Sequence, residues 1–260
     1  ESLVRLGDGG PEPPFFCFPG AMANVHATLG PLARHLGPER PVYALQDGPG
    51  VPAGVHAMAA RYRREMRTVH DHGPYYLGGV CAGARVAFEM AQQLRAAGEE
   101  VAFLALVEPA PLRASYWGLL VDLGLRLTHR SGHHSSALRR LDGKERRAYL
   151  RLKFKLLADL WAARGYRPQP YRGSLHLLLT AESLGSERAR WGDLARGGAH
   201  LHTIPGSHGS ITGYLGAPLW DDHLRATAQT LRACMAALTW RSQAPQSGVP
   251  EPVRVSPRPA

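Results

Sequence analysis

Short apolar runs alternate along the chain with longer segments in which apolar residues recur every three or four positions. The run VAFLALV (101–107) is apolar throughout, which is typical of a strand buried on both faces of a parallel sheet. The predicted strands are 14–18, 41–45, 75–80, 101–107, 174–181 and 200–206, and the predicted helices are 24–36, 55–70, 82–97 and 218–239. This alternation predicts an α/β protein with a mostly parallel central sheet and helices on both faces.

Residues 112–170 interrupt the alternation because they contain no clear strand. Their sequence is rich in Leu, Arg and His, and its spacing predicts helices over 116–128, 136–141 and 144–163. We interpret this insertion as a helical lid over the carboxyl ends of the strands, where open α/β sheets place their active sites.

The two ends of the chain differ from its body. Residues 1–12 are predicted to be an N-terminal linker, and the opening ESLVRLGDGG lacks the basic and apolar regions of a secretory signal. Residues 241–260 are rich in proline and lack apolar periodicity, so they are predicted to be a disordered tail. A single domain is therefore expected over 13–240. No stretch approaches 18 uninterrupted apolar residues, so no membrane span is predicted.

The chain of 260 residues has 31 Lys and Arg against 21 Asp and Glu, a net charge of +10. The surplus fits either the Arg-rich, Lys-poor composition of high-GC genomes, which is favoured, or an anionic partner such as nucleic acid, lipid or an acidic protein; no basic run with interleaved aromatic residues predicts nucleic-acid binding. Between 126 and 155, ten basic residues accompany only two acidic ones, so the lid either attracts an acidic partner or presents a solvated face.

Three cysteines are an odd, sparse set that favours a reducing, cytoplasmic setting over a disulfide framework. A monomer is the default expectation.

The strongest chemical signal is Gly-Gly-Val-Cys-Ala-Gly over 78–83, at a predicted strand-to-helix junction. It matches the G-x-S-x-G nucleophile elbow with Cys81 in place of serine. The tight turn requires small residues two positions before and after the nucleophile, here Gly79 and Gly83. Cys81 is therefore the candidate nucleophile, at a helix N-terminus that favours a thiolate.

A nucleophilic cysteine needs a base, and position selects among the 13 histidines. His208 lies in the loop Pro-Gly-Ser-His-Gly-Ser after the last predicted strand, where this architecture places the base. His26, near the exit of the first strand, is a candidate for lining the site.

The acid that orients the base has two candidates. Glu108 directly follows the strand next to the nucleophile strand, where its carboxylate would orient the imidazole. Glu182 follows the next predicted strand and is the alternative.

An oxyanion hole needs two backbone N–H groups. One is expected from Ala82, and the other from the turn after the first strand, with Ala21 preferred over Met22. Neither G-x-G-x-x-G nor G-x-x-x-x-G-K-[ST] is present, so nucleotide binding is not predicted.

No metal site is expected from the sequence. The cysteines Cys17, Cys81 and Cys234 are not at ligand spacing, and the pair His133-His134 has no third partner nearby. Cys17 and Cys234 are interpreted as core residues.

Four phrases, PFFCFPGAMANV, LARHLGPERPVYALQ, GPYYLGGVCAGARVAFEMAQQL and IPGSHGSI, resemble the thioesterase domain that ends non-ribosomal peptide synthetases and polyketide synthases. The resemblance implies an α/β-hydrolase fold with Cys81 as nucleophile, His208 as base and Glu108 as acid. It also implies Ala21 and Ala82 as the oxyanion donors. The implied substrate is an acyl or peptidyl chain carried as a thioester on the phosphopantetheine arm of an upstream carrier domain, with no cofactor bound by the domain itself.

The chain departs from the family pattern at two positions, since the family usually has serine at Cys81 and aspartate at Glu108. Transfer to a serine converts a thioester into a more stable oxoester, whereas transfer to Cys81 exchanges one thioester for another. The acyl-enzyme therefore keeps its activation, which favours attack by an amine or closure of a strained ring.

The resemblance and the cysteine together predict a product-releasing enzyme that forms a lactam or lactone. Some Cys-bearing family members look specialised for four-membered rings, so a β-lactam or β-lactone is a candidate product. Hydrolytic release, an editing thioesterase and a non-catalytic acyl-carrier binding module are the alternatives.

Overall fold

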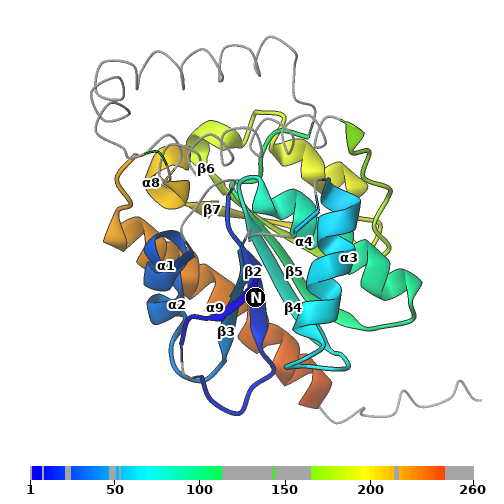
Figure 1. The fold of residues 1–260 in the computed structure, drawn as a ribbon. Helices are drawn as coiled ribbons and strands as arrows, with labels where there is room; N and C mark the ends of the chain where they lie inside the picture. The colour runs from blue at the N-terminus through cyan, green and yellow to red at the C-terminus, as the bar shows by residue number, and fades with distance from the viewer. Residues whose placement is uncertain are drawn as a thin grey trace, which may run out of the picture.

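A seven-stranded sheet with helices on both faces forms the body of the protein (Figure 1). The computed structural model describes residues 2–7, 9–20, 25–46, 51–52, 54–112, 143, 165–213 and 217–243. The strands are β1 (Leu3–Arg5), β2 (Phe15–Phe18), β3 (Val42–Leu45), β4 (Tyr75–Val80), β5 (Val101–Val107), β6 (Leu175–Thr180) and β7 (Ala199–Ile204). Their order is β1-β3-β2-β4-β5-β6-β7, and every pairing is parallel except that of β1 with β3. The predicted α/β class with a mostly parallel sheet is confirmed.

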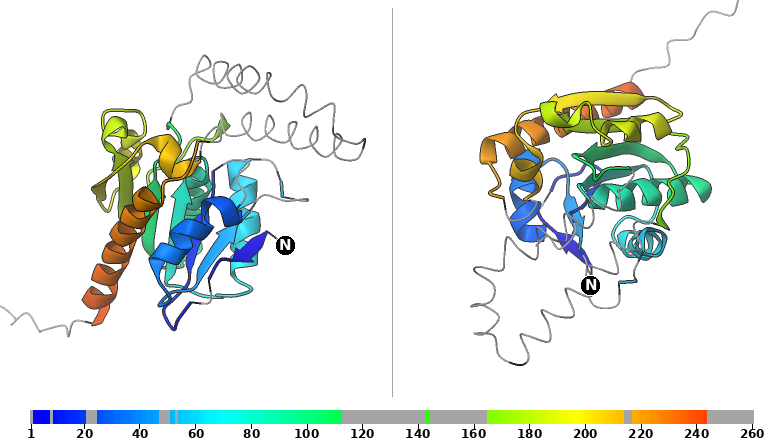
Figure 2. Two further views of the ribbon diagram at one scale, coloured as in Figure 1. Left: turned by 90° about the vertical axis from the view of Figure 1, so that its left-hand side faces the viewer. Right: turned by 90° about the horizontal axis from the view of Figure 1, so that it is seen from above.

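The helices cover the sheet in two layers (Figure 2). They are α1 (Val25–Thr28), α2 (Gly30–Leu36), α3 (Val55–Met66), α4 (Gly83–Ala96), α8 (His208–Thr212) and α9 (Asp221–Gln243), with short 3₁₀ turns η1 (Ala181–Ser183) and η2 (Ala189–Leu194). One buried cluster joins α3 and α4 to the sheet, and a second joins α1, α2 and α9 to its other face. Apolar residues on both faces of the strands are thus covered, which explains their nearly continuous apolar sequence.

The structure differs from the sequence-based boundaries in three places. Leu3–Arg5, assigned above to a linker, form the edge strand β1, which is too short to give a periodic signal. The helix predicted over 24–36 is divided into α1 and α2 at Leu29, because Pro31 has no backbone N–H with which to continue the hydrogen bonds of α1 and is instead placed in the first turn of α2. Helix α9 starts at Asp221 and continues to Gln243.

Two predictions fall largely outside the described residues. Of the predicted lid, 112–170, the structure describes only Leu112, Gly143 and 165–170, so the lid stays a prediction. The predicted tail, 241–260, is described only as far as Gln243. In the parts of the chain that the structure does describe, no helix combines the length and the apolar character needed to cross a membrane.

Candidate active site

Cys81 occupies a sharp turn between the central strand β4 and helix α4. Its φ is 51°, a left-handed conformation that is strained for a residue with a side chain. Three backbone hydrogen bonds hold the turn: Cys81 N–H donates to Val107 O (3.1 Å), and the Cys81 carbonyl accepts from Ala84 N (3.2 Å) and Ala110 N (2.9 Å). The neighbouring strand and the start of α4 therefore hold Cys81 in a sharp strand-to-helix turn, which is the backbone geometry expected of a nucleophile elbow.

The two glycines of the elbow are required by close backbone approach. A Cβ at Gly79 would lie 2.5 Å from Ala84 Cα and 2.6 Å from Gly83 O. A Cβ at Gly83 would collide with the carbonyl oxygens of Phe18 and Pro19, at the end of β2. Small residues at these two positions let α4 pack directly against the strand ends.

Replacing Gly83 with alanine is expected to lower the free energy of unfolding by about 1–3 kcal/mol, because the new methyl group meets backbone that cannot swing away. Urea denaturation of the purified domain measures this change. Gly30→Ala is the matched control, since no heavy atom lies within 4 Å of a Cβ there and the change in stability should stay within about 0.5 kcal/mol. Equal stability of the Gly83 and Gly30 variants would contradict the packing argument.

His208 is the first residue of α8 and is held there by a capping box. Ser207 Oγ accepts from Ser210 N (3.3 Å), while Ser210 Oγ accepts from Ser207 N (2.9 Å). His208 Nδ1 lies 3.0 Å from Glu108 Oε2, and because an ionised carboxylate only accepts, Nδ1 carries the proton. The Cys81 thiol lies close enough to the same imidazole to raise the pKa of His208, so the ring lies near both side chains.

Glu108 follows β5 and is completely buried, with a left-handed φ of 44°. Besides His208, it accepts hydrogen bonds from Thr180 N (2.6 Å, at Oε1) and Ser183 Oγ (2.9 Å, at Oε2). Burial by itself would raise the pKa of Glu108, but these three donors outweigh burial and hold the pKa below its ordinary value. The carboxylate is thus kept ionised beside the imidazole.

Burial opposes protonation of the His208 ring, but the hydrogen bonds to Cys81 and Glu108 outweigh it and raise the pKa of His208. The pocket therefore stabilises an imidazolium, which is the state that a base reaches after it has taken a proton from a thiol. Cys81 is 8% exposed and the His208 side chain is 15% exposed, so both are shielded by neighbouring residues but still in contact with solvent.

The structure thus brings together Cys81, His208 and Glu108, whereas the alternative acid, Glu182, is exposed in η1. Ala82 lies directly before α4, at the position expected for an oxyanion donor. Ala21 and Met22 lie outside the described residues. His26 is exposed on α1, in contact with solvent.

Four residues near this site were not singled out from the sequence. Thr180 and Ser183 supply the extra donors to Glu108, and only their place at the end of a strand could have suggested this role. Arg85 donates to Pro111 O and Arg188 to Pro109 O, both at 2.5 Å, and these contacts hold the segment that follows Glu108. No local sequence pattern marks the two arginines, because their acceptors are backbone carbonyls distant in sequence.

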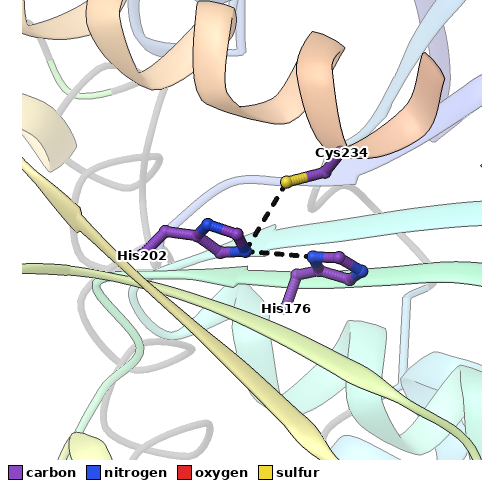
Figure 3. A group of neighbouring side chains, drawn as sticks. All are labelled: His176, His202 and Cys234. Carbon is purple, nitrogen blue, oxygen red and sulfur yellow. Dashed lines mark hydrogen bonds between the residues drawn. The ribbon is translucent and has the colours of Figure 1, made fainter. Parts of the chain in front are cut away.

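A separate group of possible metal ligands consists of His176, His202 and Cys234 (Figure 3). The sequence predicts no metal site, and its pattern favours Cys234 as a core residue. His176 and His202 are 26 residues apart in the sequence, and His202 and Cys234 are 32 residues apart. These separations are far from any familiar ligand spacing.

The elbow, the paired imidazole and carboxylate, and the sheet order define an enzyme site of the α/β-hydrolase type. The model of the Thioesterase domain family matches residues 13–215, and the chain belongs to this family.

Three comparisons illustrate the relationship. The chain is 43% identical to indigoidine synthase of Dickeya dadantii (strain 3937) over 112 residues, which is 41% of this chain and 8% of that protein. It is 26% identical to the NocB thioesterase domain, solved as a covalent complex with a fluorophosphonate nocardicin G analogue, with a TM-score of 0.66 and coverage of 90% and 99%. A four-domain nonribosomal peptide synthetase bound to AMP and glycine shares the fold, with 22% identity, a TM-score of 0.69 and coverage of 90% and 20%. The chain therefore spans a small part of the two synthetases.

Proposed function

We propose that this thioesterase domain releases an acyl or peptidyl chain by way of a covalent thioester on Cys81. The observation that carries the proposal is the imidazole of His208, which lies 3.0 Å from the buried Glu108 carboxylate and close enough to the Cys81 thiol for that thiol to raise the pKa of His208. The family match and the likeness to the NocB domain, which was captured in a covalent complex, support it. A non-catalytic binding module would have no need for a strained nucleophile turn aligned with an imidazole.

The proposed first step is acyl transfer. His208 takes the proton of the Cys81 thiol, and the thiolate attacks the carbonyl carbon of the incoming thioester. The resulting oxyanion accepts a hydrogen bond from Ala82 N–H and a second one from Ala21 N–H, the donor that the sequence favours. When the intermediate collapses, the bond to the donor sulfur breaks and His208 returns the proton to that sulfur. Glu108 stabilises the imidazolium between these two proton transfers.

The proposed source of the acyl group is the phosphopantetheine arm of a carrier domain upstream of this one. The similarity to parts of large synthetases supports such a partner, because a thioesterase in an assembly line receives its substrate already bound as a thioester. The chemistry described requires no cofactor, since the thioester supplies the activation and the chain supplies nucleophile, base and acid.

We further propose that release occurs by cyclisation to a lactam or lactone, with a four-membered ring as the candidate that the cysteine favours. Exchange of one thioester for another leaves the acyl group activated, so an internal amine or hydroxyl can close a strained ring. Hydrolysis by water, as in an editing thioesterase, is the second candidate. His208 would serve in either case, by deprotonating the attacking group and returning the proton to Cys81.

The substitution Cys81→Ser tests this proposal. It is expected to lower the ratio of cyclic to hydrolysed product at least about tenfold, equivalent to ~1.4 kcal/mol in the relative barriers. Liquid chromatography with mass spectrometry measures both products from a carrier-mimic thioester. Equal rates and product ratios for the starting enzyme and its Cys81→Ser variant would refute the thioester argument.

In the unaltered protein, peptide mapping should place the acyl group on Cys81 and not on Cys17, because burial raises the pKa of Cys17 to about 12.

A further inference from the structure

His176, His202 and Cys234 converge from three elements at one side of the sheet (Figure 3). His176 belongs to β6, His202 to the edge strand β7, and Cys234 to the long helix α9 that packs across this face. His176 Nδ1 lies 3.1 Å from His202 Nε2, which in turn lies 3.5 Å from Cys234 Sγ. All three ligand atoms lie within 4.8 Å of one another.

These separations fit the edges of a tetrahedron around zinc. Bonds of about 2.0–2.1 Å to nitrogen and about 2.3 Å to sulfur at tetrahedral angles place two nitrogens about 3.3 Å apart and a nitrogen and a sulfur about 3.5 Å apart. The observed distances of 3.1 Å and 3.5 Å are close to both values. The third pair, Cys234 Sγ and the ring nitrogen of His176, lies within 4.8 Å, and Cys234 would move toward His176 to close this edge.

Hydrogen bonding alone accounts poorly for the same contacts. His202 Nε2 faces both His176 Nδ1 and Cys234 Sγ, yet a ring nitrogen offers either one N–H or one lone pair. It can therefore form one well-directed hydrogen bond, and the second contact has to share the same nitrogen. A cation placed between the three atoms would satisfy all of them at once.

We propose that His176, His202 and Cys234 form a Zn²⁺ site that fastens helix α9 to strands β6 and β7. Two imidazoles and one thiolate are a donor set that suits zinc, and a water molecule would complete four-coordination. His200 stacks on His176 with ring centroids 4.8 Å apart. When zinc binds, the Cys234 thiol releases its proton to solvent and the thiolate forms the Zn–S bond.

The surroundings of the three ligands suit an ion that enters from solvent. Cys234 is buried, whereas the two histidines are half-buried. Strand β7 ends at Ile204, and the chain then leads to His208 at the start of α8. By holding β7 in place, the ion would stabilise the position of His208 without contacting the reacting atoms.

Metal titration of the whole domain tests the proposal. After treatment with a chelator and dialysis, the Cys81→Ala protein should bind one equivalent of Zn²⁺ in equilibrium dialysis, and Co²⁺ should give a thiolate-to-metal charge-transfer band. The Cys81→Ala background is used because Cys81 and His208 are a second thiol and imidazole that lie close together and could themselves bind the metal ion. In that background, His202→Ala and Cys234→Ser should each weaken Zn²⁺ binding by about 100-fold or more.

His72→Ala is the matched control, since the His72 side chain is 82% exposed and should not affect zinc affinity. Zinc should also raise the melting temperature of the starting protein and of the His72 variant, and leave that of the Cys234 variant unchanged. Zinc binding that survives loss of His202 and Cys234 would overturn the proposal, as would binding that requires Cys81. If the ligand variants do not fold, a Co²⁺ spectrum of the Cys81→Ala protein without a thiolate band overturns it equally.

Discussion

Replacing Glu108 with glutamine is expected to lower kcat/KM for a carrier-mimic thioester by about 10³- to 10⁴-fold. Glutamine keeps the size of the side chain but removes the charge that stabilises the His208 imidazolium. It also turns an acceptor into an NH₂ group, in a pocket where Thr180 N, Ser183 Oγ and His208 Nδ1 all approach the carboxylate. At least one donor would then face another donor, because either Thr180 N–H or the imidazole N–H loses its acceptor, depending on the orientation of the amide. Steady-state kinetics with a pantetheine thioester measure the loss.

Glu182→Gln is the matched control for this substitution. Glu182 follows β6 in the same way that Glu108 follows β5, but it is exposed in η1. Its substitution should change kcat/KM by less than about twofold, which is the size expected for an exposed side chain that takes no part in the chemistry. A larger effect at Glu182 than at Glu108 would mean that the acid has been assigned to the wrong strand end.

The sequence was informative where one physical requirement acts on neighbouring residues. The run VAFLALV predicts β5 because a strand between two others, covered on both faces, must be apolar throughout. The elbow could be recognised because Gly79 and Gly83 must make room for backbone within a few residues of Cys81. In both cases the constraint lies within one short stretch, and the structure agrees closely with the prediction.

The sequence was uninformative where a site is assembled from distant segments. Ser183 reaches Glu108 across 75 residues, and nothing in the local pattern of either residue indicates this contact. His176, His202 and Cys234 come together only because β6 and β7 are neighbours and α9 returns across them. The choice between Glu108 and Glu182 also needed coordinates, since both directly follow a strand and only Glu108 turns its carboxylate toward His208.

Replacing His208 with alanine is expected to slow acylation of Cys81 by about 10²- to 10⁴-fold, the usual contribution of a positioned general base. The loss should stay within this range because a thiol is partly ionised near neutral pH and is intrinsically nucleophilic, so Cys81 can react slowly without help. Rapid-quench mass spectrometry of the acyl-enzyme isolates this step from product release.

Chemical rescue distinguishes a base from a residue that only supports the fold. The alanine variant leaves a space between Cys81 and Glu108 that free imidazole can enter, because the ring of His208 contacts both residues. Added imidazole should therefore restore part of the acylation rate of the His208 variant and should leave a Glu108→Gln variant unchanged, since that protein keeps its own ring. Absence of rescue in a variant that unfolds at the same urea concentration as the starting protein would contradict the assignment of His208 as the base. Rescue of both variants to the same extent would do so too, because the imidazole would then be acting on the thioester in solution rather than at the vacated position.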